Sequence, residues 1–470
     1  MDAIQNFLLG IVSKINMYLS DYILIFLLVG VGLFYTIRTR FVQIRCFGEG
    51  MKQVFGGIFS KKNGAKGGLS SFQALATAVA AQVGTGNIVG ACGAILIGGP
   101  GAIFWMWVIA FFGMATIYAE ATLAQNTKVV GENGAVLGGP VYYIKKAFKG
   151  TFGKILAAFF AIATILALGF MGTMVQSNSI AGAINNAVPA IPTFAVGIVL
   201  AIICGFIFIG GIKRIASVAE KVVPAMAVIY IILAIIVLGV NIKAVPATFG
   251  MIFKYAFVPH AVLGGGIGFA LKTAISQGAK RGLFSNEAGM GSTPHAHAQA
   301  EVEIPHQQGV AAMIGVFVDT FIVLTMTALV VITTLYKDGV PVVDVTKNNM
   351  MQVAMGTVFG TTAGSLLVAI CLMFFAFTTI ISWNFFGKQN VEYMFGKKNA
   401  KAATIIYSVI AIAFIFLGTV FQSDLVWELT DFFNYLMVLP NALALFVLSR
   451  IVVDATKEGK ARKKANKNNK

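Results

Sequence analysis

Phe72 to Gly98 reads Phe72-Gln-Ala-Leu-Ala-Thr-Ala-Val-Ala-Ala-Gln-Val-Gly84-Thr-Gly-Asn87-Ile-Val-Gly-Ala-Cys-Gly-Ala-Ile-Leu-Ile-Gly98. The stretch carries no charge and is long enough to span a bilayer as a helix. Its middle, Gly84 to Asn87, consists of weak helix formers, and glycine accepts backbone angles that other residues resist. We therefore predict two half-helices that meet near the bilayer midplane, with Asn87 as the N-cap of the second.

A broken span leaves main-chain N–H and C=O groups without partners, and hydrocarbon cannot satisfy them. The N–H groups that begin the second half-helix suit a carboxylate, and the carbonyls that end the first half suit Na⁺ or an ammonium group. Paired half-helices of this kind form the binding sites of secondary transporters. A glycine-kinked span that packs against a neighbouring helix is the alternative interpretation.

The composition is that of an all-α polytopic membrane protein. Of 470 residues, 58% are hydrophobic and 11% are charged, whereas soluble domains carry roughly 25% charged residues. The net charge of +17 does not indicate nucleic-acid binding, because the basic residues lie in loops between apolar spans, where they set orientation. The four cysteines are scattered and predict neither a disulfide framework nor a metal site.

Apolar stretches predict eleven transmembrane helices, at Tyr22–Ile37, 72–98, Ala102–Gln125, Ile155–Ile184, Phe194–Gly211, Val222–Val240, Leu263–Ala300, Gly309–Leu335, Ser365–Phe386, Thr404–Phe421 and Leu425–Leu448. With this number, all strongly basic loops face the cytoplasm and the N-terminus lies outside. Residues 1–21 are then an outer, interfacial segment, and residues 450–470 are a basic cytoplasmic tail, which we expect to be disordered.

Without the helix at 22–37, the remaining helices divide into two inverted repeats, 70–240 and 241–449. The second and seventh spans are counterparts, and both contain an interruption. In the seventh, we favour a break at Phe284-Ser285-Asn286, with Asn286 capping the second half. Lys280 and Arg281 then lie in the membrane, where Glu287 or Asp319 would have to pair with them. A break at Gly264–Gly268 is the alternative.

Four motifs resemble the sodium:alanine (alanine or glycine:cation) symporter family. They are Gly84-Thr-Gly-Asn-Ile88, Gly98-Gly-Pro-Gly-Ala-Ile-Phe-Trp-Met-Trp107, Gly138-Gly-Pro-Val-Tyr142 and Arg281-Gly-Leu-Phe-Ser-Asn-Glu-Ala-Gly-Met-Gly-Ser292. The resemblance implies a leucine-transporter-like 5+5 inverted repeat with one extra N-terminal helix. It also implies Na⁺- or H⁺-driven uptake of small neutral amino acids across the bacterial inner membrane.

The expected substrate pocket surrounds the two breaks. Thr85 and its glycine neighbours are expected to bind the substrate carboxylate, Phe284 to cover its side chain, and Trp383 to limit its size. The centre of the fourth span, around Gly172, is unusually polar and is expected to face the pocket. The candidate substrate-binding residues are Gln82, Gly84, Thr85, Gly86, Asn87, Gly172, Phe284, Ser285, Asn286 and Trp383.

Resemblance to the leucine-transporter fold also implies a Na⁺ site between the ninth span and the lower half of the second. Its candidate ligands are hydroxyl and carbonyl oxygens, from Ala80, Val83, Phe375, Thr378 and Thr379. Hydroxyls that bond the carbonyl four residues earlier in their own helix are the alternative for the two threonines.

The sequence therefore predicts a symporter in the lipid bilayer that imports alanine or glycine with Na⁺ as coupling ion. Glutamine or serine as substrate, H⁺ as coupling ion, and a channel are the alternatives. No nucleophile–base pair supports an enzyme. Glu120 and Asp319 lie within apolar spans as proton carriers or as members of structural ion pairs. The oligomeric state does not follow from the sequence.

Overall fold

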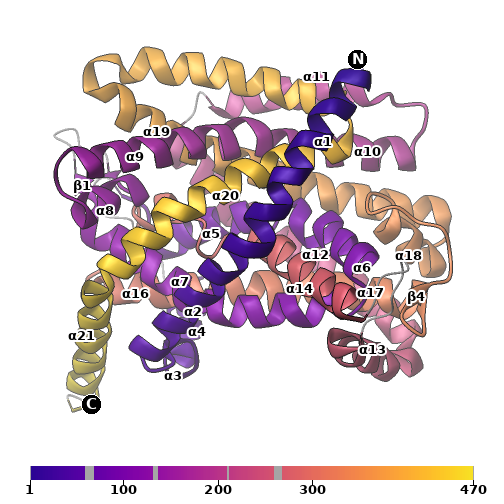
Figure 1. Ribbon diagram of the computed structural model, residues 1–470, viewed down its shortest axis with the longest axis horizontal. Helices are drawn as coiled ribbons and strands as arrows, with labels where there is room; N and C mark the ends of the chain where they lie inside the picture. The colour runs from indigo at the N-terminus through magenta and orange to yellow at the C-terminus, as the bar shows by residue number, and fades with distance from the viewer. Residues whose placement is uncertain (1, 59–67, 131–135, 209–210, 259–266, 469–470) are drawn as a thin grey trace.

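The computed structural model describes residues 2–58, 68–130, 136–208, 211–258 and 267–468. These are almost entirely helical, with two short antiparallel hairpins (Figure 1). Up to residue 240, the elements are α1 (Asp2–Tyr18), η1 (Leu19–Leu24), α2 (Ile25–Arg38), α3 (Val42–Arg45), α4 (Phe47–Ile58), α5 (Ser71–Gln82), η2 (Gly86–Gly90), α6 (Ala91–Gly98), α7 (Ala102–Thr127), β1 (Val129–Val130), β2 (Val136–Leu137), α8 (Pro140–Ala147), α9 (Gly150–Thr164), η3 (Ile165–Gly172), α10 (Thr173–Ala187), α11 (Thr193–Phe208) and α12 (Gly211–Val240).

The remaining elements are η4 (Ile242–Ala244), α13 (Val245–Phe257), α14 (Ile267–Asn286), α15 (Pro294–His297), α16 (Pro305–Val316), η5 (Phe317–Leu324), α17 (Thr325–Leu335), β3 (Tyr336–Lys337), β4 (Val340–Pro341), α18 (Met350–Phe359), α19 (Thr361–Gly418), α20 (Ser423–Val447) and α21 (Ser449–Asn468). Helix α19 contains two helices that meet at Gly396, where φ is 65°.

Apolar helices long enough to cross a membrane make up most of the bundle. Among the described residues there are eight, and the bent pair α5 and η2–α6 is a ninth candidate. The predicted fifth span corresponds to α11, which is shorter, and the predicted seventh to α14, the turn after it and α15. The chain is thus a multi-pass membrane protein, and the count of eleven stays a prediction.

The first helix begins far earlier than predicted. A continuous helix covers Ile4–Arg38, so helical structure does not begin at Tyr22. The early part of this helix is held along α20: the Gln422 main-chain N–H donates to Gln5 (2.9 Å), and the Asn16 amide donates to Glu428 (2.6 Å). These polar contacts account for a helix where weak amphipathicity alone indicated an interfacial segment.

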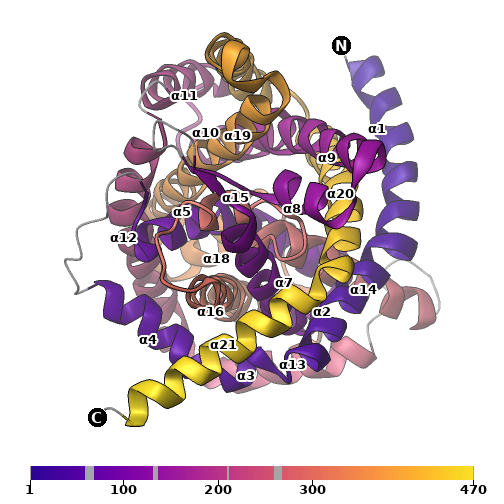
Figure 2. The same ribbon diagram turned by 90° about the vertical axis from the view of Figure 1, so that its left-hand side faces the viewer.

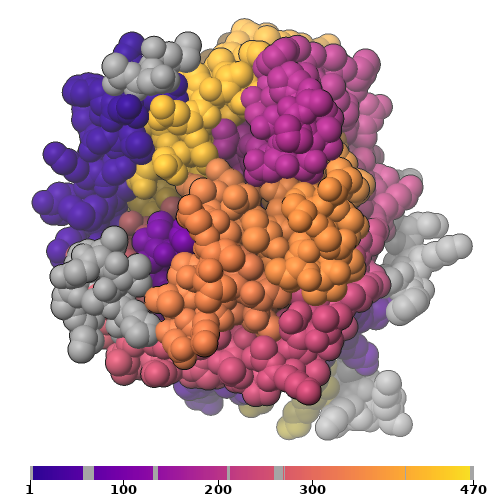
Figure 3. Space-filling view, turned by 90° about the vertical axis from the view of Figure 1, so that its right-hand side faces the viewer, coloured from indigo at the N-terminus to yellow at the C-terminus, as the bar shows by residue number. Residues whose placement is uncertain are grey.

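The C-terminal tail is also more ordered than predicted. Residues 449–468 form α21, which leaves the bundle at the end opposite to α18 and the β3–β4 hairpin (Figure 1). The expectation of disorder was therefore wrong for this segment, because α21 packs against α7 and α16. At the other end, the segment with β3, β4 and α18 covers the centre of the face in Figure 3 (orange).

The broken pair lies at the centre of the bundle. Residues from Ala74 to Ile95 are buried throughout. Helices α12, α16 and α19 pack against α5, and α14 packs against α6, so that helices from both halves of the chain enclose the break (Figure 2). A polar segment in this position is shielded from lipid on all sides, as the physics of an interrupted span requires.

Candidate functional site

The first break separates α5 from η2. Helix α5 begins at a capping box in which the Ser70 hydroxyl accepts from the Gln73 N–H and the Gln73 side chain accepts from the Ser70 N–H, a pattern typical of helix starts. It ends at Gln82, and Val83 leaves the helical conformation with ψ at 88°. The two parts of the span meet at 47°. The interruption predicted at Gly84 to Asn87 is therefore present but lies slightly earlier, since it begins at Val83 and both Gly86 and Asn87 belong to η2.

Asn87 does not cap the second half-helix as predicted. Its Oδ1 accepts from the Gly84 N–H at 2.9 Å, and its Nδ2 donates to Asp319 Oδ1 at 2.6 Å. The residue at the N-cap position of η2 is Thr85, which makes no side-chain cap. The Asn87 side chain therefore satisfies the Gly84 N–H, which is not free for a ligand, and links the break to Asp319.

Thr85 retains unused hydrogen-bonding capacity. Its N–H donates to Oε1 of Gln176, on α10, at 3.2 Å. Within the described parts of the chain, its hydroxyl and the amide oxygen of Gln82 have no hydrogen-bond partner, although both are buried. Buried polar atoms are usually paired. The break therefore holds a donor group and an acceptor that suit a polar ligand.

The carbonyl side of the break faces α19. Oγ1 of Thr379 lies 2.9 Å from the Ala80 carbonyl oxygen and 3.0 Å from that of Phe375. Thr378 points elsewhere: its hydroxyl donates to the carbonyls of Phe374 and Phe375 and contacts the Met226 sulfur on α12. Both threonines contact the carbonyl four residues earlier in α19, and of the two only Thr379 also meets the broken span.

The second break follows α14. This helix ends at Asn286, and Glu287, Gly289 and Gly291 then have positive φ angles of 58°, 94° and 80°. The Asn286 side chain accepts from the Ala288 N–H at 3.1 Å, so it closes the end of α14 and does not cap α15. The break thus lies just after the predicted position. Of the alternative Gly264–Gly268, residues 264–266 lie outside the described residues and Gly268 is helical.

Glu120 supports the second break. Its carboxylate accepts from the N–H groups of Gly289 (3.1 Å) and Gly291 (3.0 Å) and from the Asn441 amide (2.6 Å). The glutamate in the break itself, Glu287, accepts from the Trp383 indole N–H at 2.6 Å and from the Ser292 hydroxyl. Neutral donors thus hold both carboxylates, in place of the ion pairs considered from the sequence.

Two aromatic rings form a wall beside the breaks. Phe284 meets Trp383 edge to face, with ring centroids 5.9 Å apart. A β-carbon at Gly172 would overlap the Trp383 ring, and one at Gly86 would lie 3.1 Å from the Phe284 ring. The structure therefore brings Gly86, Gly172, Phe284 and Trp383 together, and their role as a substrate pocket stays a prediction.

Asp319 joins the site as a buried carboxylate. Besides Asn87, it accepts from the hydroxyls of Ser285 (3.0 Å) and Thr320 (2.8 Å). From the sequence, Asp319 was a candidate partner of Lys280 and Arg281 or a proton carrier, and not a member of the central site. Its position between the two breaks depends on how η5 packs against η2 and α14, which periodicity does not reveal.

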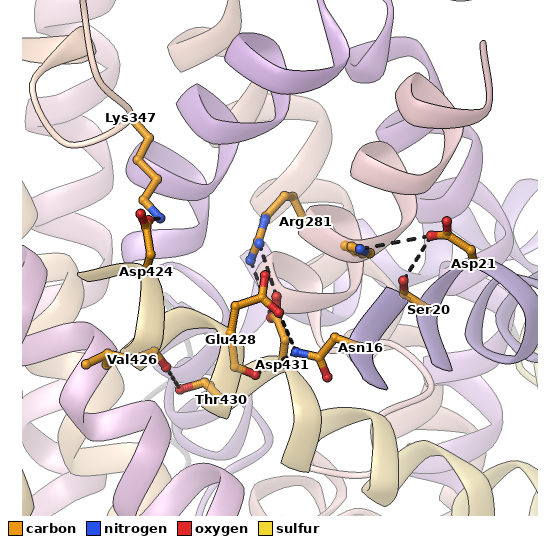
Figure 4. Close-up of polar contacts among 11 residues, drawn as sticks. Asn16, Ser20, Asp21, Arg281, Lys347, Asp424, Val426, Glu428, Thr430 and Asp431 are labelled. Atoms are coloured by element: carbon orange, nitrogen blue, oxygen red, sulfur yellow. Dashed lines mark hydrogen bonds and ion pairs between the residues drawn. The ribbon is translucent and has the colours of Figure 1, made fainter. Parts of the chain in front are cut away.

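Lys280 and Arg281 pair with aspartates outside the two breaks. Arg281 lies 3.0 Å from Asp431 on α20, and Lys280 lies 4.0 Å from Asp21 on the first helix. Figure 4 shows Arg281 directed at Asp431, near Glu428. The prediction that Glu287 or Asp319 would neutralise these cations was therefore wrong, because the charged ends reach helices near the two termini of the chain.

Comparison with known proteins gives a consistent result. The model of the "Sodium:alanine symporter family" matches residues 5–470. The chain is 39% identical over 449 residues to "Sodium/alanine symporter AgcS" of Methanococcus maripaludis, covering 95% of this chain and 96% of the relative. It is 38% identical over 463 residues to "Probable sodium/glutamine symporter GlnT" of Bacillus subtilis, covering 98% of this chain and 93% of the relative.

A solved structure shows the fold alone. MhsT in complex with L-phenylalanine superposes with a TM-score of 0.60 at 17% identity, covering 82% of this chain and 90% of that chain. The likeness supports a leucine-transporter-like fold. From the family model and the long, closely covered relatives, we conclude that this chain belongs to the sodium:alanine symporter family, a family of transporters and not of enzymes.

Proposed function

We propose that the protein imports a small neutral amino acid, alanine or glycine, together with Na⁺ by alternating access. The observation that carries this proposal is the buried break after Gln82. Its carbonyl side meets the Thr379 hydroxyl, while the Thr85 hydroxyl and the Gln82 amide oxygen have no partner among the described residues. The carboxylate of an amino acid would accept from the Thr85 hydroxyl, and its ammonium group would donate to the Gln82 amide oxygen. A cation would bind the carbonyl oxygens.

The substrate carboxylate is proposed to bind at Thr85. The Gln176 amide oxygen now accepts from the Thr85 N–H, and a carboxylate oxygen can replace it because the same donor is stronger toward an ionised acceptor. The Thr85 hydroxyl supplies a second donor. The substrate ammonium group then faces the Gln82 amide oxygen, and the small side chain faces Phe284 and Trp383.

The Na⁺ ligands are proposed to be oxygens of Ala80, Val83, Phe375 and Thr379. Hydroxyl and carbonyl oxygens are the hard ligands that such cations prefer. Thr379 already joins the carbonyls of α5 and α19, so an ion at this position would fix α5 relative to α19. If this arrangement favours substrate binding, linkage requires that substrate increase the affinity for Na⁺ by the same factor.

The membrane orientation follows from charge. We propose that the basic helix α21 faces the cytoplasm, which places α18 and the start of α1 outside, in the cell membrane. The halves 70–240 and 241–449 act as inverted repeats whose broken members are α5–α6 and α14–α15. The fold of MhsT supports this assignment at the level of architecture.

Two alternatives rest on specific observations. Proton coupling is favoured by Asp319 and Glu287, buried carboxylates beside the breaks that are held by neutral donors. Glutamine as substrate is suggested by the 38% identity to the glutamine symporter.

Uptake into proteoliposomes distinguishes Na⁺ coupling from proton coupling and alanine from the other substrates. Radiolabelled alanine should accumulate under an inward Na⁺ gradient, and a panel of unlabelled glycine, serine and glutamine should rank the substrates by competition. Accumulation that continues unchanged after both the Na⁺ and proton gradients are removed would contradict the proposal.

A further inference from the structure

Three different metal-ligand side chains meet where α21 crosses the bundle. Cys46 follows α3, Glu49 lies in the first turn of α4, and His306 begins α16. The cysteine sulfur, a carboxylate oxygen and a histidine nitrogen all lie within 4.8 Å of one another, and His306 Nε2 is 3.1 Å from Glu49 Oε1. Figure 2 shows α3, α4, α16 and α21 together at this end of the molecule.

The His306 ring is held in a fixed orientation. The Tyr118 hydroxyl lies 2.6 Å from Nδ1 and 3.0 Å from the Thr456 hydroxyl. With a proton on Nδ1, Tyr118 accepts from His306 and donates to Thr456. Nε2 points at Glu49 Oε1, so without a metal it donates a proton to this carboxylate, and a bound metal would take the place of that proton. Such a partner on the other ring nitrogen is typical of metal-binding histidines. Gly459 of α21 packs on the ring so closely that a β-carbon there would overlap it.

We propose that Cys46, Glu49 and His306 form a zinc-binding site. Thiolate, imidazole and carboxylate are the three side-chain ligands that Zn²⁺ uses, and a water molecule commonly completes a three-ligand site. Ligand atoms around tetrahedral zinc lie roughly 3.5 Å apart, so the present arrangement needs only a small contraction. The Glu49 side chain is 27% exposed, which gives water and the ion access.

A simple ion pair does not account for this cluster. Glu49 and His306 alone would form one, and Lys463 adds a second cation at 3.4 Å from the other Glu49 oxygen. Such a pair does not need the Cys46 thiol, which is the strongest zinc ligand of the three when ionised. The Lys463 side chain is 58% exposed, so it can move into water at little cost when the metal binds.

The proposed site would join segments that are far apart in the sequence. The ligands come from the short helices after the first span and from the start of α16, which continues through η5 toward Asp319. No spacing motif links Cys46 to His306, so the sequence alone predicts no metal site here. Bound zinc would connect the α3–α4 segment to a helix that contributes to the central site.

Thiol labelling of the full-length protein in detergent tests the proposal. Cys46 is half-buried, whereas Cys92, Cys204 and Cys371 are buried, so a maleimide reports mainly on Cys46. After treatment with a chelator, micromolar Zn²⁺ should slow labelling about tenfold or more, because a metal-bound thiolate is a poor nucleophile. Mg²⁺ should have no effect. In H306Q and E49Q, zinc should give little protection, and in the control C204S it should protect as in the wild type.

Cobalt absorption provides an independent measurement. Co²⁺ added to the metal-free protein should produce a thiolate-to-cobalt charge-transfer band in wild type and C204S, but not in C46S, and Zn²⁺ should abolish it. The cobalt measurement tests the proposed zinc site even if H306Q does not fold. The proposal is overturned if zinc leaves the wild-type labelling rate unchanged, if protection survives in both H306Q and E49Q, or if C46S retains the band.

Discussion

The break after Gln82 and the break after Asn286 lie next to each other, joined by the Gln82 amide, which donates to the Asn286 carbonyl at 2.7 Å. They differ in how their main-chain groups are satisfied. At the second break, the Glu120 carboxylate binds the N–H groups of Gly289 and Gly291. At the first, the neutral amides of Asn87 and Gln176 accept from the N–H groups of Gly84 and Thr85.

This difference indicates that the two breaks have different roles. A buried carboxylate with several donors is a strong and lasting partner, so the second break is braced by the protein itself. A neutral amide oxygen is more easily replaced, and among the residues that the structure describes the Thr85 hydroxyl has no hydrogen-bond partner. We infer that the first break is the part that exchanges ligands, and that the second provides a rigid wall with Phe284 and Trp383.

The largest effect is expected from Gly84→Ala, which fills the first break. The added β-carbon would lie 2.5 Å from Thr379 Oγ1, and this hydroxyl is held by the carbonyls of Ala80, Ala81 and Phe375. Overpacking of this kind costs about 1–3 kcal/mol, so Na⁺-driven alanine uptake should fall by about tenfold to hundredfold. The matched control is Gly93→Ala, on α6, whose β-carbon would meet Lys347 at an ordinary 3.7 Å. Equal uptake in the two variants would refute the role of the first break.

Glu120→Gln tests the brace at the second break. The substitution removes the charge from three hydrogen bonds. The free energy of unfolding in detergent should therefore fall by about 2 kcal/mol. The exposed Glu458→Gln on α21 serves as the control and should leave stability unchanged. The Na⁺ concentration for half-maximal uptake should stay near the wild-type value in the protein that remains folded. A change in Na⁺ dependence without a loss of stability would mean that the second break takes part in ion binding.

Thr379→Val and its neighbour Thr378→Val compare two hydroxyls in the same turn of α19. Only Thr379 reaches the carbonyl side of the first break, so its loss should raise the half-saturating Na⁺ concentration about tenfold, the cost of roughly one hydrogen-bonding oxygen. Thr378 faces Met226, and its valine variant should change this value by less than about twofold. Na⁺ titration of alanine uptake measures both. Equal shifts would place the ion elsewhere.

The smallest effect is expected from Trp383→Phe, in the wall. The variant loses the hydrogen bond to Glu287 and leaves space beside Gly172. Larger substrates should therefore inhibit alanine uptake more strongly than they do in the wild type. The expected change is about threefold in the ratio of glutamine to alanine inhibition, since pocket-size discrimination by hydrophobic groups is modest. An unchanged ratio in competition assays would show that Trp383 does not limit substrate size.

The sequence was sufficient to predict the first break because Gly84 to Asn87 interrupts an otherwise uninterrupted apolar helix, a signal that is local. It also indicated the neighbourhood of the second break, through Asn286 and the glycines that follow. The caps were predicted wrongly because both asparagines bond across the break or at the end of the preceding helix, and such choices depend on tertiary neighbours.

Long-range contacts explain the other errors. Arg281 pairs with Asp431, a distant residue that no local pattern connects to it. The early start of the first helix and the order of α21 were not predicted, because both come from packing against α20, α7 and α16 and not from strong amphipathicity. Thr378 and Thr379 are adjacent in sequence, and only the rotation of α19 decides which one faces α5.

The central claim is that the first break binds substrate and Na⁺ together, and equilibrium binding of radiolabelled alanine to the purified protein tests it most directly. We predict saturable binding that requires Na⁺ in the wild type and in Thr378→Val, with Thr379→Val needing about tenfold more Na⁺. Alanine binding of equal strength with and without Na⁺, or the same Na⁺ requirement in both threonine variants, would contradict the account.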